Sequence, residues 1–430
     1  MKKVITIFSY IIIALFILAL FGWMVNQVST KNKKFGILTE PIKFMYSFPD
    51  LFEESVEEVK RFPKTFLPTY EKFEKTNKLD KDLIVLTSLS EDDDSRTVAL
   101  INLRNDSILR TWNVENPWGE TGRIINPIYQ EQDGSLIYHY YYHMRPGMFK
   151  LDSNGNELWN NDSLVMHHGM NLNDEGDIWV CTIYPGKASG SYTIDGRSMY
   201  YNDYRITKYS NQTGEIIYDK SITAILRENN LGNYLLKSAE TDEPLHLNDV
   251  QPALKTTRYY KEDDVFISLR NIHCILHYRP STNELINLIE GPFINQHDVD
   301  FLNDSTLAIF NNNTFVDMHV QSRKAHTDTS RLEIAGSFYS NIVTYDLSNQ
   351  EFEIVGDSIF RANRIFTKNE GLMEFLDEET FFVEEQNQGL LWVLKNDEVI
   401  YKNIQKSQHE GHHHLPNWTR VIRYGEKSFR

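Results

Sequence analysis

The sequence has 430 residues, of which 41% are apolar and 13% aromatic, enough for one large domain or two of ordinary size. Its net charge of −16, without clustered lysine and arginine, argues against a nucleic-acid partner, because phosphate binding requires a basic surface. It does not exclude a small anionic substrate, which responds to the local field rather than to the total charge.

The N-terminal stretch from Val4 to Val28 is almost uninterrupted apolar sequence, about the 20 residues needed to cross a bilayer. Small residues suited to a cleavage site do not follow it. We therefore expect an uncleaved transmembrane signal-anchor over residues 1–30. Lysines at positions 31, 33 and 34 weaken the positive-inside rule, so charge alone does not determine the orientation.

Residues 31–80 alternate proline, aromatic and charged residues and include a candidate short helix, Leu51–Arg61. We expect a stalk or linker here, or a segment packed on the main domain. From about residue 81 the pattern changes to strands of four to eight residues, separated by turns rich in Asn, Asp, Gly and Ser. This pattern predicts an all-β domain over residues 81–430.

A polar turn between two short strands recurs six times, at intervals of about 48 to 70 residues. The turns lie at residues 103–108, 151–158, 209–216, 278–285, 345–352 and 394–399. Each interval has room for four strands, so the repeat predicts a six-bladed β-propeller, in which radial repetition protects the strand edges. A large β-sandwich with chance similarity among its hairpins is the alternative.

A second repeat marks the strands that open the blades. Residues 168–180 align without gaps with residues 297–309, and residues 126–138 fit the same frame. His168, His297 and Asn126 thereby occupy equivalent positions in three blades. Such positions at the mouths of the inner strands converge on the central channel, so we expect the two histidines to face one another.

Further residues join this group. His246 begins another candidate inner strand, and Arg270 follows in the next strand of that blade. His167 lies beside His168, and only the alignment with His297 favours His168 as the one facing the channel. A lone histidine near a strand end is usually structural, but the joint placement makes these residues a candidate site.

Four segments resemble, in chain order, the motifs of the bacterial arylsulfotransferase family: His167-His168, His246-Leu247-Asn248-Asp249, Ser268-Leu269-Arg270-Asn271 and Gln296-His297-Asp298. The resemblance covers residues 126–313 well and the remaining blades to residue 420 more loosely. It implies a periplasmic six-bladed propeller that moves a sulfuryl group from a phenolic sulfate to another phenol, without 3′-phosphoadenosine phosphosulfate. The group rests transiently on a histidine, in a ping-pong reaction.

The resemblance assigns catalytic roles to His297, His246, Arg270 and His168. A neutral His297 would attack the sulfur and hold it as sulfohistidine. Arg270 offers a planar, permanently charged fork that suits sulfate oxygens. His246 and His168 would donate hydrogen bonds to these oxygens, or a proton to the departing phenolate.

The substrate-binding residues expected around them are His167, Asn126, Asn248 and Asn271. Asp298 could orient His297, although neighbours in a strand point to opposite faces. Gly169 stands where family members commonly carry aspartate. We expect no metal and no cofactor, and the expected substrates are a small-molecule aryl sulfate and a hydroxyl acceptor.

Together with the anchor, the resemblance predicts a single-pass inner-membrane protein whose C-terminal domain lies in the periplasm. The anchor leaves open a lipid or cell-envelope acceptor. A sulfatase or metal-assisted hydrolase using the same pocket and a non-catalytic ligand- or protein-binding propeller are the alternatives. Cys181 and Cys274 lie in apolar runs, either as buried free thiols or as one disulfide. The histidines at 412–414 are expected in a flexible polar loop.

Overall fold

The computed structural model describes residues 2–31, 35–39, 41–42, 44, 63, 65–70, 72–93, 95–114, 124–141, 146–185, 189–314 and 339–423. The chain divides into two compact units, Met1–Phe62 and Pro63–Arg430. The candidate short helix Leu51–Arg61 lies outside the described residues.

The first unit contains one long helix, α1 (Lys2–Lys31), and a short 3-10 turn, η1 (Gly36–Leu38). Within α1, Phe8–Val28 has a mean hydropathy of 2.5 and exposes its large apolar side chains. An apolar helix of this length is able to cross a bilayer or to serve as a secretion signal. The predicted apolar N-terminal helix is therefore confirmed.

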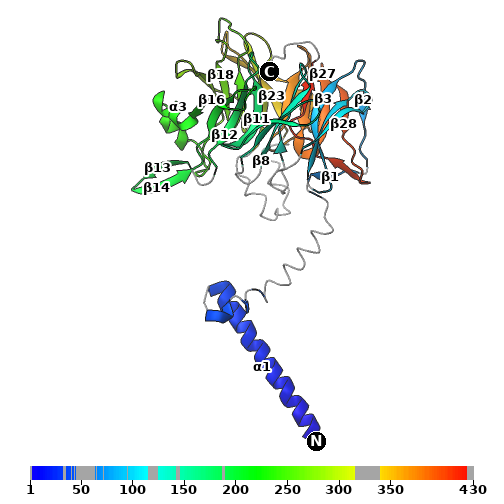
Figure 1. Cartoon of the computed structure of the whole chain (residues 1–430), viewed down its shortest axis with the longest axis vertical. Coiled ribbons are helices and arrows are strands. Elements are labelled where there is room, and N and C mark those ends of the chain that lie inside the picture. Colours follow the sequence, from blue (N-terminus) through cyan, green and yellow to red (C-terminus); the bar gives the residue numbers. More distant parts are fainter. Residues whose placement is uncertain are drawn as a thin grey trace. The chain divides into compact units, whose positions relative to one another are not determined.

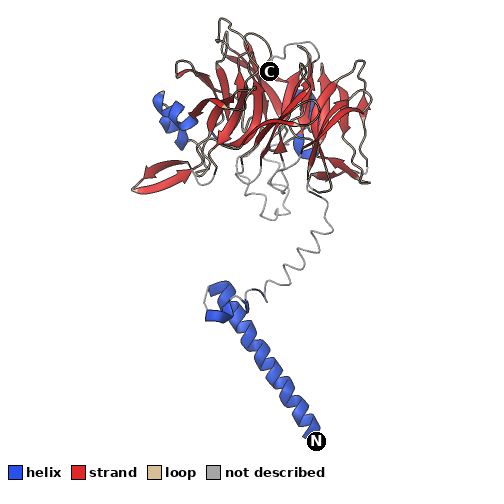
Figure 2. Ribbon diagram, in the orientation of Figure 1, coloured by secondary structure: helices blue, strands red, loops and turns tan. Residues whose placement is uncertain are grey.

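The second unit is a six-bladed β-propeller, as predicted, and strands dominate it (Figures 1 and 2). The innermost strands are β6 (Ile124–Ile125) with β7 (Ile128–Gln130), β11 (Val165–Leu172), β17 (Leu247–Pro252), β21 (Val299–Phe301), β25 (Leu372–Phe375) and β30 (Arg420–Ile422). The second strands are, in the same order of blades, β8 (Ser135–Tyr141), β12 (Ile178–Ile183), β18 (Val265–Leu269), β22 (Thr306–Asn311), β26 (Thr380–Glu385) and β3 (Ile84–Ser90).

The outer half of each blade is a further antiparallel pair. The third strands are β9 (Met148–Leu151), β15 (Arg205–Tyr209), β19 (Cys274–Arg279), β23 (Asn341–Asp346), β27 (Leu390–Lys395) and β4 (Arg96–Asn102). The outermost strands are β10 (Glu157–Asn161), β16 (Ile216–Ser221), β20 (Glu284–Glu290), β24 (Glu351–Val355), β28 (Glu398–Ile404) and β5 (Ser107–Val114). Each of the six predicted turns joins the third and fourth strands of one blade, so the repeat in the sequence is the outer hairpin.

The hydrophobic core consists of layers between neighbouring blades. Side chains alternate between the two faces of a strand, and both faces of the inner strands are buried. In β12, for example, Trp179 and Cys181 pack toward the blade of β17, whereas Ile178 and Val180 pack toward the blade of β8. Six such clusters fill the six gaps between blades and hold the ring together.

Segments far apart in the chain close the ring. β30, near the C-terminus, pairs with β3 and supplies the innermost strand of that blade. β2 (Thr76–Asn77) adds an edge strand to β28, and β1 (Phe66–Pro68) pairs with β29 (His412–His414). The histidines at 412–414 therefore form a strand, which corrects the expectation of a loop. β1 and β2 both lie within the segment expected to be a linker.

Smaller elements decorate the blades. β13 (Gly190–Ile194) and β14 (Arg197–Tyr201) form a hairpin between β12 and β15. The helices are α3 (Ile222–Glu228), η2 (Gly232–Leu236), η3 (Arg270–Ile272), α4 (Asp357–Asn363) and η7 (Gln386–Gln388). Cys181 and Cys274 are buried free thiols, so the disulfide alternative is wrong.

Candidate active site

Two histidines enter the central region from irregular starts of inner strands. His168 sits at a bulge of β11 with φ of 58°, and His246 immediately precedes β17 with φ of 48°. Residues other than glycine rarely adopt positive φ, because the Cβ atom crowds the backbone. This conformation turns both side chains out of the regular strand alternation and toward the same place.

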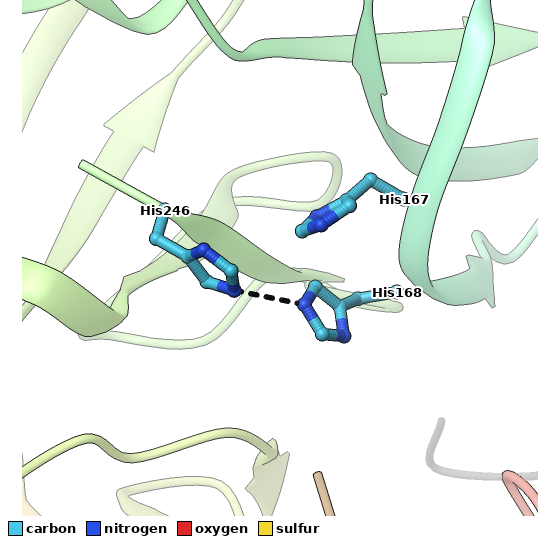
Figure 3. A group of neighbouring side chains, drawn as sticks. All are labelled: His167, His168 and His246. Carbon is cyan, nitrogen blue, oxygen red and sulfur yellow. Dashed lines mark hydrogen bonds between the residues drawn. The ribbon is translucent and has the colours of Figure 1, made fainter. Parts of the chain in front are cut away.

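His167, His168 and His246 form a compact cluster (Figure 3). His168 Nε2 and His246 Nε2 lie 3.0 Å apart, and the ring centroids of His167 and His168 are 4.0 Å apart. All three side chains are buried, with His168 and His246 each 7% exposed. Both members of the His167-His168 pair therefore belong to one cluster.

Residues outside the cluster contact the Nδ1 atoms of His167 and His246. His167 Nδ1 donates to the carbonyl oxygen of Leu247 at 3.1 Å. His246 Nδ1 lies 2.9 Å from Glu243 Oε2, although this contact is poorly aligned as a hydrogen bond. Tyr204 donates its hydroxyl proton to the other oxygen of Glu243. Both imidazoles thus have an oxygen acceptor next to Nδ1.

His297 lies beside the cluster, with a ring-centroid distance of 5.5 Å to His168. The two histidines, distant in sequence, therefore face one another as predicted. His297 Nδ1 contacts Asn312 Oδ1 at 2.6 Å and the carbonyl oxygen of Asn295 at 3.1 Å. Because both are acceptors, the ring proton is on Nδ1, and Nε2 accepts the N–H of Glu370 at 3.1 Å.

Arg270 opens η3 and is 7% exposed. Its backbone N–H donates to the His246 carbonyl, and its Nε donates to Asn271 Oδ1 at 3.0 Å. Asn271 in turn donates to the carbonyl of Glu243 at 2.7 Å. Within the described residues, the two terminal guanidinium nitrogens make no hydrogen bond, so they are available to an anion.

Asn126 and Asn248 use their amide nitrogens to tie neighbouring blades. Asn126 Nδ2 donates to the His168 carbonyl, and Asn248 Nδ2 donates to the Gln296 carbonyl at 2.7 Å. Both side chains are fully buried, and their amide oxygens have no partner among the described residues. Their contacts hold the backbone on which the histidines sit.

Burial keeps the histidines neutral. It lowers the pKa of His297 to about 3 and that of His167 to about 4, and the charge of Arg270 adds to both effects. Burial and neighbouring positive groups also lower the pKa values of His168 and His246 well below the usual range. Each ring therefore carries one lone pair at neutral pH.

Sequence reasoning missed Asn312 and Glu370. Asn312 Oδ1 holds His297, whereas Asp298, the expected partner, accepts the N–H of Met373 at 3.0 Å. Burial, and then the nearby Glu384 carboxylate, raises the pKa of Glu370 to about 7. Its Oε2 accepts from Asn417 Nδ2 at 3.1 Å.

Gly169 leaves room for the side chain of Asp249. A Cβ atom at this position would lie 3.0 Å from Asp249 Oδ1 and 3.4 Å from the ring of Trp418. An aspartate at this position, which the resemblance leads one to expect, would therefore meet the buried Asp249 directly. Glycine is the residue that this close approach permits.

The arylsulfotransferase (ASST) family model matches residues 133–406, which is more than half of the chain. The chain belongs to the arylsulfotransferase family. All four motifs and the four proposed catalytic residues lie inside the matched range. Membership implies an enzyme of the aryl-sulfate sulfotransferase type that does not use 3′-phosphoadenosine phosphosulfate, and aryl sulfates as its substrates.

Solved structures resemble this arylsulfotransferase-family chain weakly. A Bacteroides caccae protein of unknown function is 12% identical with a TM-score of 0.49, and the match covers 80% of this chain and 100% of that one. A streptogramin B lyase is 13% identical (TM-score 0.38), and virginiamycin B lyase from Staphylococcus aureus is 10% identical (0.37). Each of these two matches covers 80% of this chain and 89% of the lyase. These similarities carry no conclusion about function. No curated protein matches the chain.

Proposed function

We propose that the protein transfers a sulfuryl group from an aryl sulfate to a phenolic or other hydroxyl acceptor, in a ping-pong reaction through a sulfohistidine at His297. The observation that carries this proposal is the state of the His297 ring. Its Nδ1 proton faces Asn312 and Asn295, which leaves the lone pair on Nε2. A neutral imidazole held in this tautomer is a nucleophile ready to attack sulfur.

In the first half-reaction, Nε2 attacks the sulfur atom, the S–O bond to the aryl group breaks and an N–S bond forms. The donor displaces the Glu370 N–H that occupies this lone pair in the structure. The imidazole ring becomes positively charged, and Asn312 Oδ1 stabilises its Nδ1 proton. Asn312 thus acts as a positioning residue.

Arg270 binds the sulfuryl oxygens through its two terminal nitrogens, and Asn271 fixes the guanidinium through Nε. The negative donor favours protonation of His246, since that ring also contacts Glu243. The resulting imidazolium gives its proton to the departing phenolate. His168, which contacts His246, supports the same oxygens.

In the second half-reaction, the acceptor hydroxyl gives its proton to His246 as its oxygen attacks the sulfur. The N–S bond breaks, and its electron pair returns to His297 Nε2. Because the product leaves before the acceptor enters, one pocket serves both molecules. His167, Asn126, Asn248 and Asn271 complete the proposed site as binding and scaffold residues.

The N-terminal helix supports a further part of the proposal. Phe8–Val28 anchors the protein in the inner membrane as a single pass, with the propeller in the periplasm. The anchor keeps the enzyme near acceptors at the cell envelope. Protease protection of the propeller in intact spheroplasts, instead of digestion, would contradict this orientation.

The decisive experiment is mass spectrometry of the full-length protein after brief exposure to a chromogenic aryl sulfate. We expect an acid-labile sulfuryl adduct on His297 in the wild type and none in His297→Asn, which also loses transfer. His277→Asn is the matched control, because His277 is equally buried but pairs with Asp264 in a blade. An adduct in His297→Asn, or none in the wild type, would overturn the proposal.

A further inference from the structure

The contacts of His167 and His246 with Leu247 and Glu243 give the histidine cluster a feature that sulfate binding does not require. His167 Nδ1 donates to the Leu247 carbonyl, so the lone pair of the neutral ring is on Nε2. The Glu243 carboxylate next to His246 Nδ1 favours the same tautomer in His246. A lone pair cannot donate to a sulfate oxygen, but it is what a metal ion binds.

We propose that His167, His168 and His246 form a binding site for a divalent transition-metal ion such as Zn²⁺, and that the ion and the sulfuryl group exclude one another. The ligand atoms of the three side chains all lie within 4.8 Å of one another. They come from the bulge in β11 and the residue before β17, and Figure 3 shows the three rings converging. Metal-binding histidines typically have a carboxylate or backbone carbonyl on the other ring nitrogen, as His167 and His246 do here.

The distances suit zinc. Tetrahedral Zn–N bonds of about 2.0–2.1 Å place two ligand nitrogens roughly 3.4 Å apart. His168 Nε2 and His246 Nε2 are already 3.0 Å apart. His168 Nδ1 has no partner among the described residues, so the His168 proton is able to move there and leave Nε2 to the ion. Three histidines leave a fourth position open, as in catalytic zinc sites.

Charge around the cluster is mixed. The positive charge of Arg270 opposes a cation, and it acts on all three rings. The Glu243 carboxylate, 2.9 Å from His246, offsets it. The ion would occupy Nε2 of His168 and of His246, the atoms that serve the sulfuryl oxygens and the departing phenolate in the proposed reaction. The ion is therefore a competitor for the histidine nitrogens, and this exclusion rests on the sulfuryl-transfer role of His168 and His246 proposed above.

The test uses the full-length protein in detergent, stripped with a chelator and titrated with Zn²⁺ and with Co²⁺. We expect one ion per chain and the visible spectrum of tetrahedral Co²⁺ with nitrogen ligands. His167→Leu and His246→Leu should each weaken binding at least about tenfold, whereas His297→Asn, outside the cluster, should bind like the wild type. The control His409→Ala/His412→Ala removes two half-buried histidines outside the cluster and should also bind like the wild type.

Absence of stoichiometric binding, an octahedral Co²⁺ spectrum or unchanged binding in both leucine variants would overturn the site. The Co²⁺ spectrum of the wild type decides the question even if a leucine variant fails to fold. A saturating aryl sulfonate, which cannot transfer its group, should raise the Kd for Zn²⁺ in His297→Asn; an unchanged Kd would refute exclusion alone. If the wild type binds no zinc but forms a normal sulfuryl adduct, this inference is wrong and the proposed reaction stands.

Discussion

Asn312 Oδ1 lies 2.6 Å from His297 Nδ1, and this contact places the lone pair of the histidine on Nε2. Asn312 directly follows β22, and His297 lies just before β21 in the same blade. Asn312 Nδ2 donates in turn to the carbonyls of Thr367 and Glu370, at 3.0 and 2.7 Å. Asn312 thus connects His297, the proposed nucleophile, to the loop that contains Thr367 and Glu370.

Replacement of Asn312 by alanine should lower kcat by about 10- to 100-fold, because the proton on Nδ1 loses its partner and the ring its orientation. KM for the donor should change much less. Asn311→Ala is the control, since Asn311 is also buried but bonds Asn341. Steady-state kinetics with a chromogenic aryl sulfate measure both values. Equal loss in the two variants would show that Asn312 acts through stability alone.

Replacement of Arg270 by lysine should lower kcat/KM for the donor by about 10- to 100-fold, because the ammonium cannot form two parallel bonds to sulfate oxygens. Arg279→Lys, whose arginine pairs with Asp264 within a blade, is the matched control. An unchanged kcat/KM in Arg270→Lys would show that Arg270 does not bind the sulfate group.

Stability should fall as the pH rises, because the folded protein holds a proton on Glu370. The pKa of this carboxyl is about 7 in the folded state and near its ordinary value when unfolded, so its stabilising effect is complete below about pH 4.5 and is lost as pH rises through 7. Glu370→Gln should therefore be more stable than the wild type at pH 8, by about 3 kcal/mol at most, and similar at pH 4.5.

Thermal unfolding at the two pH values measures this difference. Glu378→Gln, at an exposed turn, provides the control and should show no such pH dependence relative to the wild type. A Glu370→Gln variant that differs from the wild type equally at both pH values would mean that this carboxyl does not titrate between them.

Substitution of Gly169 by alanine should destabilise the propeller by about 1–3 kcal/mol, because the added methyl group presses on Asp249 and the Trp418 ring. Gly232→Ala is a suitable comparison, because the new methyl group would meet the flexible side chain of Arg227. If both variants melt at the wild-type temperature, the space beside Gly169 is larger than the structure indicates.

The sequence was sufficient to predict the fold because the outer hairpins repeat. Equivalent residues of 168–180 and 297–309 indeed pair in the same register, as Met170 with Val180 and Val299 with Ile309. Convergence of His168 with His297 follows from that register.

Other parts of the site had no such signal. Asn312 lies in a run of three asparagines that looks like an ordinary turn. Glu370 reaches His297 through its backbone N–H, which any residue could supply. Glu243 acts through its carboxylate, but the position of that carboxylate depends on how the loop before His246 folds. Side-chain chemistry at a repeat position is visible in sequence, whereas backbone contacts from connecting loops are not.

The ring of blades closes only late in the synthesis of the chain. β30 is the last of the described strands to leave the ribosome, yet it belongs to the blade of β3, β4 and β5, which is made first. Until it arrives, β3 has an open edge on which other extended chains could pair. Trp418, whose ring centroid lies 6.1 Å from that of His168, arrives in the same segment. The surroundings of His168, a member of the proposed site, are therefore complete only when the ring is closed, and a chaperone that shields the edge of β3 would act during that interval.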